Sequence, residues 1–241
     1  MIKRLFTNAI AVATLLSGTV VVGLVLSYLV LWAAGVADEF IVPIALGIVG
    51  GLAMAIGYFR FHFNPLTVGS LGETKWRIHA VLVAVGAVVL VLMNVLHESQ
   101  LPLALTAPVV VVLEEIIFRG MPLSLLSRLQ CSSGVRIGVV FVFALAFSVL
   151  HVSPFVSMFL DRLVFAVLAQ TLAIRWQSLW PSVIFHLFSN AIALSAAPPQ
   201  NEGDCWFFIG IDFVLFFLMY MMSALIRSMG PISEMDQGAR R

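Results

Sequence analysis

Residues 101–118 read LPLALTAPVVVVLEEIIF, an apolar run that contains two adjacent acids, Glu114 and Glu115, and is followed by Arg119. A charged side chain near the centre of a bilayer carries a high free-energy cost. Where such residues occur in membrane spans, they face the protein interior and mark sites of catalysis or of proton and ion transfer. Two neighbouring glutamates in this run therefore predict a functional site inside a membrane protein.

The composition of the whole chain supports a membrane protein. Of its 241 residues, 61% are hydrophobic and only 10% are charged, whereas a soluble domain has about 25% charged residues. The net charge of +1 gives no indication of nucleic-acid binding. The first apolar segment, residues 8–36, exceeds the ~7–15 apolar residues of a signal-peptide core, so we predict a retained helix.

The predicted fold is all-α, a polytopic membrane protein that forms a single transmembrane domain over residues 1–241. Eight apolar segments are each long enough to cross about 30 Å of hydrocarbon at about 1.5 Å per residue. The sequence shows no internal repeat and no linker that would separate a second domain. The eight predicted spans cover residues 8–36, 40–58, 78–96, 101–126, 134–152, 155–174, 179–196 and 206–226.

Charged residues predict the orientation of these spans. If the chain crosses eight times, most basic residues fall in connections on one side and most acidic residues on the other, where Arg162, next to Asp161, is the one basic residue that approaches. By the positive-inside rule, both termini are then cytoplasmic. We therefore expect a multi-pass protein of the cell (inner) membrane. The inner connections and termini contain Lys3, Arg4, Arg60, Lys75, Arg77, Arg128, Arg136, Arg175, Arg227, Arg240 and Arg241. The outer connections contain Asp38, Glu39, Glu98, Glu202 and Asp204.

Two later spans add polar residues at a depth similar to that of the glutamates. Helical rise, counted from the expected inner end of each span, places Glu114 about 21 Å deep and His151 about 22 Å deep. The same count places His186 about 14 Å deep and Asn190 about 20 Å deep. These four side chains are therefore expected to converge on one site.

Spacing along the helices predicts how these residues face. Glu115 and Arg119 are four residues apart, as are His186 and Asn190, so each pair shares a helix face. An ion pair between Glu115 and Arg119 would leave Glu114 unpaired, about 100° around the helix. The alternative is that these residues have structural roles. The two glutamates would then form an ion pair with Arg119, and Asn190 would make an interhelical contact.

The chemistry of the set favours hydrolysis. Glu114 and His151 could together take a proton from water, and Phe147, four residues before His151, could pack beside the imidazole. His186 and Asn190 could donate hydrogen bonds to an oxyanion. Two histidines and a glutamate also form a plausible zinc set, so a zinc ion bound by His151 and His186 stays open.

Other polar residues are predicted to lie near the membrane surface. Asp161 and Arg162 suggest an interfacial ion pair, and Asp212 is expected to reach the outer interface. The chain has no His-Glu-x-x-His zinc motif and no Gly-x-Ser-x-Gly nucleophile motif. Two alternatives to hydrolysis stay open, namely a proton-coupled transporter and a catalytically silent membrane scaffold.

Three motifs resemble those of the CPBP intramembrane proteases, the family of type II CAAX prenyl endopeptidases and bacteriocin-processing membrane proteases. EEIIFRG at residues 114–120 resembles the first motif, and FSVLH at 147–151 resembles the second. SLWP at 178–181, followed by HLFSN at 186–190, resembles the third. The motifs occur in the family's order, and they define a catalytic core over residues 101–196.

The resemblance implies an intramembrane endopeptidase and a role for each matched residue. Glu114 would activate the attacking water with help from His151, while His186 and Asn190 would bind the oxyanion, or His186 would ligate zinc. The implied partners are the lipid bilayer and a membrane-associated peptide, either CAAX-like and prenylated or a leader or signal peptide. No nucleic-acid partner is implied. The supporting residues are Glu115, Arg119 and Phe147.

Overall fold

The computed structural model describes residues 2–36, 41–42, 44–49, 52, 73–96, 101–128, 132–151, 156–176, 178–196 and 202–228. Across these residues the chain is helical and contains no strand, which confirms the predicted all-α class. The elements are α1 (Ile2–Ala33), α3 (Glu73–Leu96), α4 (Leu101–Glu115), the π-helical turn η1 (Ile116–Gly120), α5 (Met121–Arg128), α6 (Ser133–Leu150), α7 (Val156–Trp176), α8 (Trp180–Ser195) and α9 (Glu202–Ser228).

Within the described ranges, five helices are long and apolar enough to cross a membrane. They correspond to the first, third, fifth, sixth and eighth predicted spans. The second predicted span, residues 40–58, lies largely outside the described residues. The total of eight spans and the cytoplasmic position of both termini therefore stay predictions. The five helical segments are Ala13–Ala33, His79–Leu96, Ser133–Leu150, Val156–Trp176 and Gly203–Met222.

The fourth predicted span is not one regular helix. It is divided into α4, η1 and α5, and the π-helical turn begins directly after Glu115. Pro122 gives a physical reason, since its nitrogen cannot donate to the carbonyl of Phe118 and its ring would clash with that carbonyl. A wider turn moves the carbonyl away. Such π-turns occur frequently at functional sites, and here the turn follows the two glutamates.

The seventh predicted span forms α8, a helix in which most residues are buried. It has 16 residues, about 24 Å in length, and Pro181 lies in its first turn, where a missing N–H is tolerated. It packs against α3, α4, α7 and α9. A Cβ added at Gly86 of α3 would lie 3.1 Å from Cβ of Leu187, so the glycine permits the close approach of α3 and α8.

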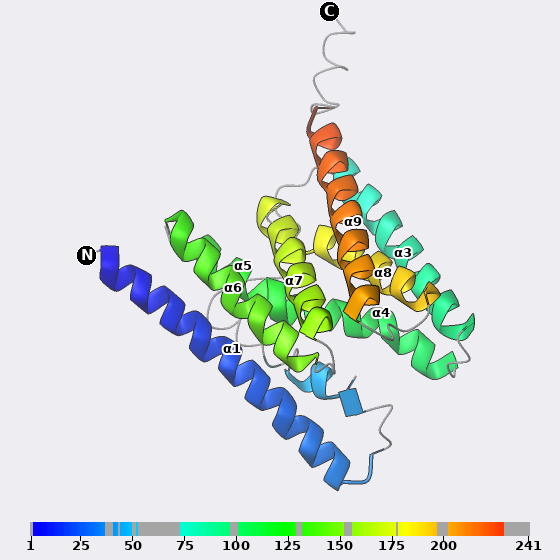
Figure 1. Ribbon diagram of the computed structural model, residues 1–241, viewed down its shortest axis with the longest axis horizontal. Coiled ribbons are helices and arrows are strands. Elements are labelled where there is room, and N and C mark those ends of the chain that lie inside the picture. Colours follow the sequence, from blue (N-terminus) through cyan, green and yellow to red (C-terminus); the bar gives the residue numbers. More distant parts are fainter. Residues whose placement is uncertain are drawn as a thin grey trace, which may run out of the picture.

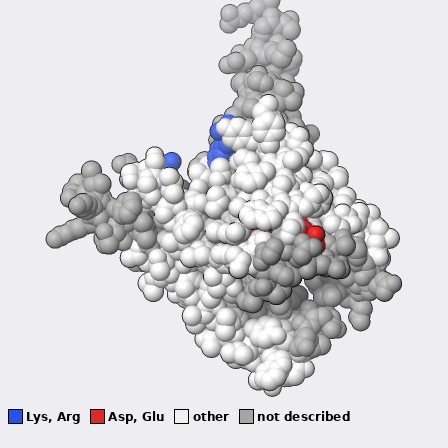
Figure 2. Space-filling view, in the orientation of Figure 1, with Lys and Arg blue, Asp and Glu red and all other residues white. Residues whose placement is uncertain are grey.

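The remaining helices pack around this part of the protein and expose apolar side chains on their outer surfaces. In Figure 1, α1 runs beside α6, and α7 lies between α6 and α9, in agreement with their contacts. Large apolar side chains are exposed on α1, α3, α6 and α9. The face in Figure 2 is almost uncharged, with its few basic atoms apart from its acidic atoms. Such a surface suits contact with lipid.

Candidate active site

The two glutamates lie where α4 passes into η1, and they have different surroundings. Glu115 is fully buried, and its Oε1 lies 3.3 Å from Nη1 of Arg119. The ion pair predicted from their spacing is therefore present. Arg119 is also buried, and its guanidinium carbon lies 4.3 Å from the ring centroid of Phe147 and 5.4 Å from that of Phe165. The charge of Glu115 is thus partnered inside the protein.

His186 joins Glu115 to Glu114. Its Nδ1 lies 2.8 Å from Oε1 of Glu115, where the ring N–H donates to the carboxylate. This hydrogen bond fixes the orientation of the imidazole. Its Nε2 is directed toward Glu114 and lies 3.6 Å from Oε2. That distance is longer than a direct hydrogen bond and is compatible with a bridging water.

His151 approaches Glu114 from α6. It follows the last residue of that helix, and its Nδ1 donates to the carbonyl of Phe147 at 2.8 Å. Its Nε2 lies 3.8 Å from Oε1 of Glu114. The rings of Phe147 and His151 are 4.2 Å apart at their centroids, which is the predicted packing. The carboxylate of Glu114 therefore lies between two oriented imidazoles.

We call Glu114, Glu115, Arg119, His151 and His186 the catalytic cluster, after the catalytic and supporting roles that the sequence predicts for them. These residues come from three segments of the chain, and the structure brings all five together. Their acid–imidazole contacts span 37 residues of sequence for the pair Glu114–His151 and 71 for the pair Glu115–His186. Spacing within one helix predicts neither contact, so tertiary packing creates the site.

The catalytic cluster opens onto a cavity of about 370 Å³, a size within the range of ligand pockets. Glu114, His151 and His186 line it, and Asn190 lines it one turn beyond His186. The four predicted catalytic residues therefore face the same space. Glu115 and Arg119 do not line the cavity, which fits a supporting position behind it. Asn94, Thr106, Phe147 and Arg162 are the further polar and aromatic residues among those that line the cavity.

Sequence reasoning missed Phe165. Its ring meets that of His186 edge-on, with centroids 4.7 Å apart, and stacks on Phe185 at 5.0 Å. The side chain is buried and so helps to hold the imidazole in place. Asp161 and Arg162 precede Phe165 at helical spacing, but the contact of Phe165 with His186 joins two different helices, so the local sequence carries no signal for it.

The metal prediction receives no support from the arrangement of donors. Among the described residues, no group of three or more His, Cys, Asp or Glu is placed to hold a metal ion. The imidazoles of His151 and His186 direct Nε2 toward Glu114 at 3.8 and 3.6 Å. Their Nδ1 atoms are held by a backbone carbonyl and a carboxylate, an arrangement that metal-ligating histidines also have. The use of zinc therefore stays a prediction to be tested.

Two acids expected near the membrane surface are buried within the protein. Asp212 is only 3% exposed and accepts a hydrogen bond of 2.7 Å from Ser189. Asp161 is 5% exposed, although the adjacent Arg162 does pair with it, with Nε 3.9 Å from Oδ2. This burial was not predicted from the sequence, and it arises because α9 packs against both α7 and α8; the depth of the two acids in the membrane stays a prediction.

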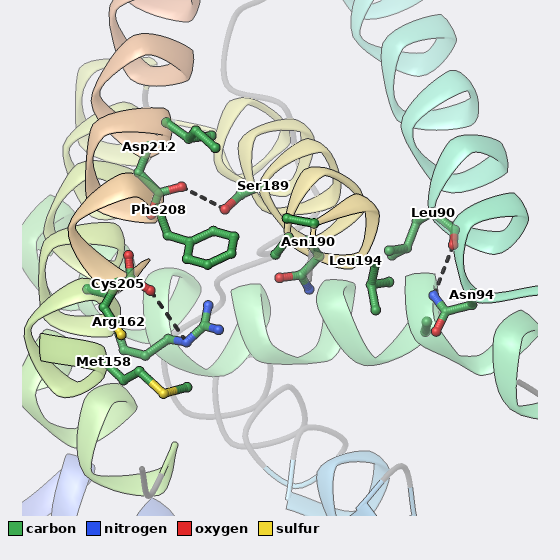
Figure 3. A pocket seen from close by; sticks show the side chains of 15 residues that line it. Leu90, Asn94, Met158, Arg162, Ser189, Asn190, Leu194, Cys205, Phe208 and Asp212 are labelled. Carbon is green, nitrogen blue, oxygen red and sulfur yellow. Dashed lines mark hydrogen bonds and ion pairs between the residues drawn. The ribbon is translucent and has the colours of Figure 1, made fainter. Parts of the chain in front are cut away.

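These acids line a second cavity of about 450 Å³, which we call the acidic cavity. Asp161 and Arg162 come from α7, Ser189 and Asn190 from α8, and Asp212 from α9. Figure 3 shows the Ser189–Asp212 hydrogen bond on one side of this space, with Arg162 and Asn190 nearby. Arg162 and Asn190 line both cavities, so the two spaces adjoin.

Comparison with known families places the site in a recognised context. Residues 97–192 match the family model of the Rce1-like type II CAAX prenyl endopeptidases. This match supports the family predicted from the three motifs. It spans most of the predicted core, residues 101–196, and supports an intramembrane protease of the CAAX type in general. No curated protein and no solved structure gave a match.

Proposed function

We propose that the chain is an intramembrane endopeptidase in which Glu114 activates the attacking water. The observation that carries this proposal is the position of Glu114 between the Nε2 atoms of His151 and His186, on the wall of a cavity. Arg119 forms its ion pair with Glu115 and not with Glu114. Glu114 therefore has acceptor capacity for a water molecule.

The first step follows from these distances. A water beside Glu114 donates one proton to the carboxylate as its oxygen attacks the carbonyl carbon of the scissile peptide bond. Nε2 of His151, whose Nδ1 is engaged by the carbonyl of Phe147, can accept a hydrogen bond from the same water. The tetrahedral intermediate then carries a negative charge on the former carbonyl oxygen.

His186 and Asn190 would stabilise that oxyanion. The hydrogen bond from Nδ1 to Glu115 orients His186 so that its Nε2 is directed at the reacting position. In the imidazolium form, this Nε2 would donate a hydrogen bond to the oxyanion. The amide of Asn190 supplies a second donor from the same helix. Collapse of the intermediate breaks the C–N bond, and the proton held by Glu114 passes to the leaving amine. The products are a new carboxyl terminus and a new amino terminus.

The proposed substrates are membrane-associated peptides or proteins, because the cavity lies among helices whose outer surfaces are apolar. The family match suggests CAAX-like or prenylated termini, and leader or signal peptides are further candidates. The cleavage would take place within or next to the lipid bilayer.

The test compares wild type with Glu114→Gln, which keeps the size of the side chain but removes its basicity. Both are expressed equally in the same cells, and the peptide termini of their membranes are compared by mass spectrometry. We expect wild-type-specific termini, whose rate of formation falls about 10²–10⁴-fold in the variant. Asp204→Asn, an acid of α9 that lines neither cavity, is the matched control and should retain the wild-type termini.

Identical termini in wild type and Glu114→Gln would overturn the proposal. Proton flux into proteoliposomes would then separate the two remaining alternatives. A pH-driven flux that depends on Glu114 would favour a transporter, and its absence would favour a silent scaffold.

A further inference from the structure

The acidic cavity contains a carboxylate with unused acceptor capacity. Oδ2 of Asp161 faces Arg162 at 3.9 Å, but Oδ1 is buried and has no hydrogen-bond partner among the described residues. A buried carboxylate oxygen without a partner is unfavourable unless a ligand or water supplies a donor. The unpartnered oxygen belongs to a side chain that lines the cavity and is more than nine-tenths buried.

The charges of the acidic cavity favour a cation. Asp161 and Asp212 supply two carboxyl groups, while Arg162 is the one basic residue among the described residues that line it. Asp212 already accepts a hydrogen bond from Ser189, and Arg162 is partly exposed. A further positive group would therefore improve the charge balance of this space.

The shape of the lining indicates what kind of cation would fit. Apolar side chains form most of the remaining wall, including Leu90, Met158, Leu194, Phe208 and Ile211. A space with apolar walls and an acidic end suits a side chain that has an aliphatic stem and a charged tip. Lysine and arginine have this form, whereas a small hydrated ion would gain nothing from the apolar walls.

The position of the acidic cavity relates it to the catalytic cluster. Asn190, one turn from His186, lines both the acidic cavity and the cavity that holds Glu114, and so does Arg162. A peptide whose scissile bond lies beside Glu114 could therefore place a neighbouring side chain in the acidic cavity. We propose that the acidic cavity is a specificity pocket for a lysine or arginine of the substrate, with Asp161 as the residue that recognises its charge.

This inference rests on the proposed function, but binding tests it without cleavage. The probes are two fluorescent apolar decapeptides that differ at one position, lysine in one and norleucine in the other. Their binding to full-length Glu114→Gln protein in a non-ionic detergent is measured by fluorescence anisotropy. We expect the lysine peptide to bind about tenfold more tightly, since a charge-assisted hydrogen bond replaces an unsatisfied oxygen.

Three further variants in the same background sharpen the test. Asp161→Asn should reduce the preference for lysine to about twofold or less. Arg162→Gln should increase it, because Asp161 then loses its competing cation. Asp204→Asn, on α9 but outside the cavity lining, should leave the tenfold ratio unchanged. The opposite signs expected for Asp161 and Arg162 distinguish charge recognition from a general loss of folding.

Equal binding of the two peptides would overturn the inference, and so would a lysine preference that survives Asp161→Asn unchanged. If Asp161→Asn does not fold, the ratio in the parent protein and its change in Arg162→Gln still decide. Cleavage by wild type separates the two proposals. Cleavage without a lysine preference would refute the specificity pocket and support the endopeptidase. Preferential binding of the lysine peptide without any cleavage would support a pocket for a basic side chain and refute the endopeptidase.

Discussion

The catalytic cluster and the acidic cavity differ in how their charges are partnered. In the catalytic cluster, Glu115 is held by Arg119 and His186, and Glu114 lies between two imidazoles. Glu115 and Asp161 each keep one buried oxygen without a hydrogen-bond partner among the described residues, but Asp161 lines an open space, whereas Glu115 lines neither cavity. Fixed groups around a reacting position favour catalysis, because they need no rearrangement. Unused hydrogen-bonding capacity beside an open space favours the binding of a ligand.

The largest expected effect is on the free energy of unfolding, which should differ between variants of the catalytic cluster and of the acidic cavity. Glu115→Ala leaves the guanidinium of Arg119 buried without its carboxylate, which should cost about 3–5 kcal/mol. Asp161→Ala leaves Arg162 without Asp161, but that side chain is 27% exposed and can reach water, so the cost should be about 1 kcal/mol or less. Unfolding in detergent micelles measures both, and equal costs would contradict the comparison.

The next effect concerns the imidazoles. His151→Phe keeps a ring that can pack on Phe147 but removes the nitrogen that faces Glu114, so turnover should fall about 10²-fold or more. His79→Phe is the matched control, because His79 is equally an aromatic contact, edge-on to Trp176 at 5.2 Å, outside both cavities. Rates per folded enzyme should be unchanged in the control. A similar loss in both variants would show that aromatic packing matters more than the position beside Glu114.

A smaller effect is expected from moving α8, which contributes to both regions. Gly86→Ala would place its Cβ 3.1 Å from Cβ of Leu187, next to His186, and should cost about 1–3 kcal/mol through overpacking. Cleavage and lysine binding should weaken together. Gly210→Ala, with open space around the added Cβ, should be neutral in the same unfolding and activity assays. Normal function of Gly86→Ala would show that the α3–α8 contact tolerates displacement.

The smallest expected effect is that of metal removal. Because the described donors form no metal-binding group, dialysis of active enzyme against a strong zinc chelator should leave its rate unchanged. The rate is compared before and after treatment, with and without added zinc. A loss of activity that zinc restores would contradict this expectation and return His151 and His186 to the role of ligands.

Part of the site could be predicted from local sequence. The Glu115–Arg119 ion pair and the Phe147–His151 packing both follow from a spacing of four residues on one helix, and the structure contains both. The hydrogen bond between Glu115 and His186 joins two different helices and could not be predicted in this way. The burial of Asp212 was missed for the same reason.

By itself, the sequence determined the all-helical membrane class, the resemblance to a protease family and the residues that form the motifs. It could do so because apolar length, charge placement and spacing along a helix are local properties of the chain. Only the tertiary structure decided which carboxylate oxygen contacts which imidazole nitrogen. It also decided that the acidic cavity adjoins the cavity lined by Glu114. Those features depend on the packing of α7, α8 and α9 and on the π-turn after Glu115, since helix contacts between distant segments leave no fixed period in the sequence.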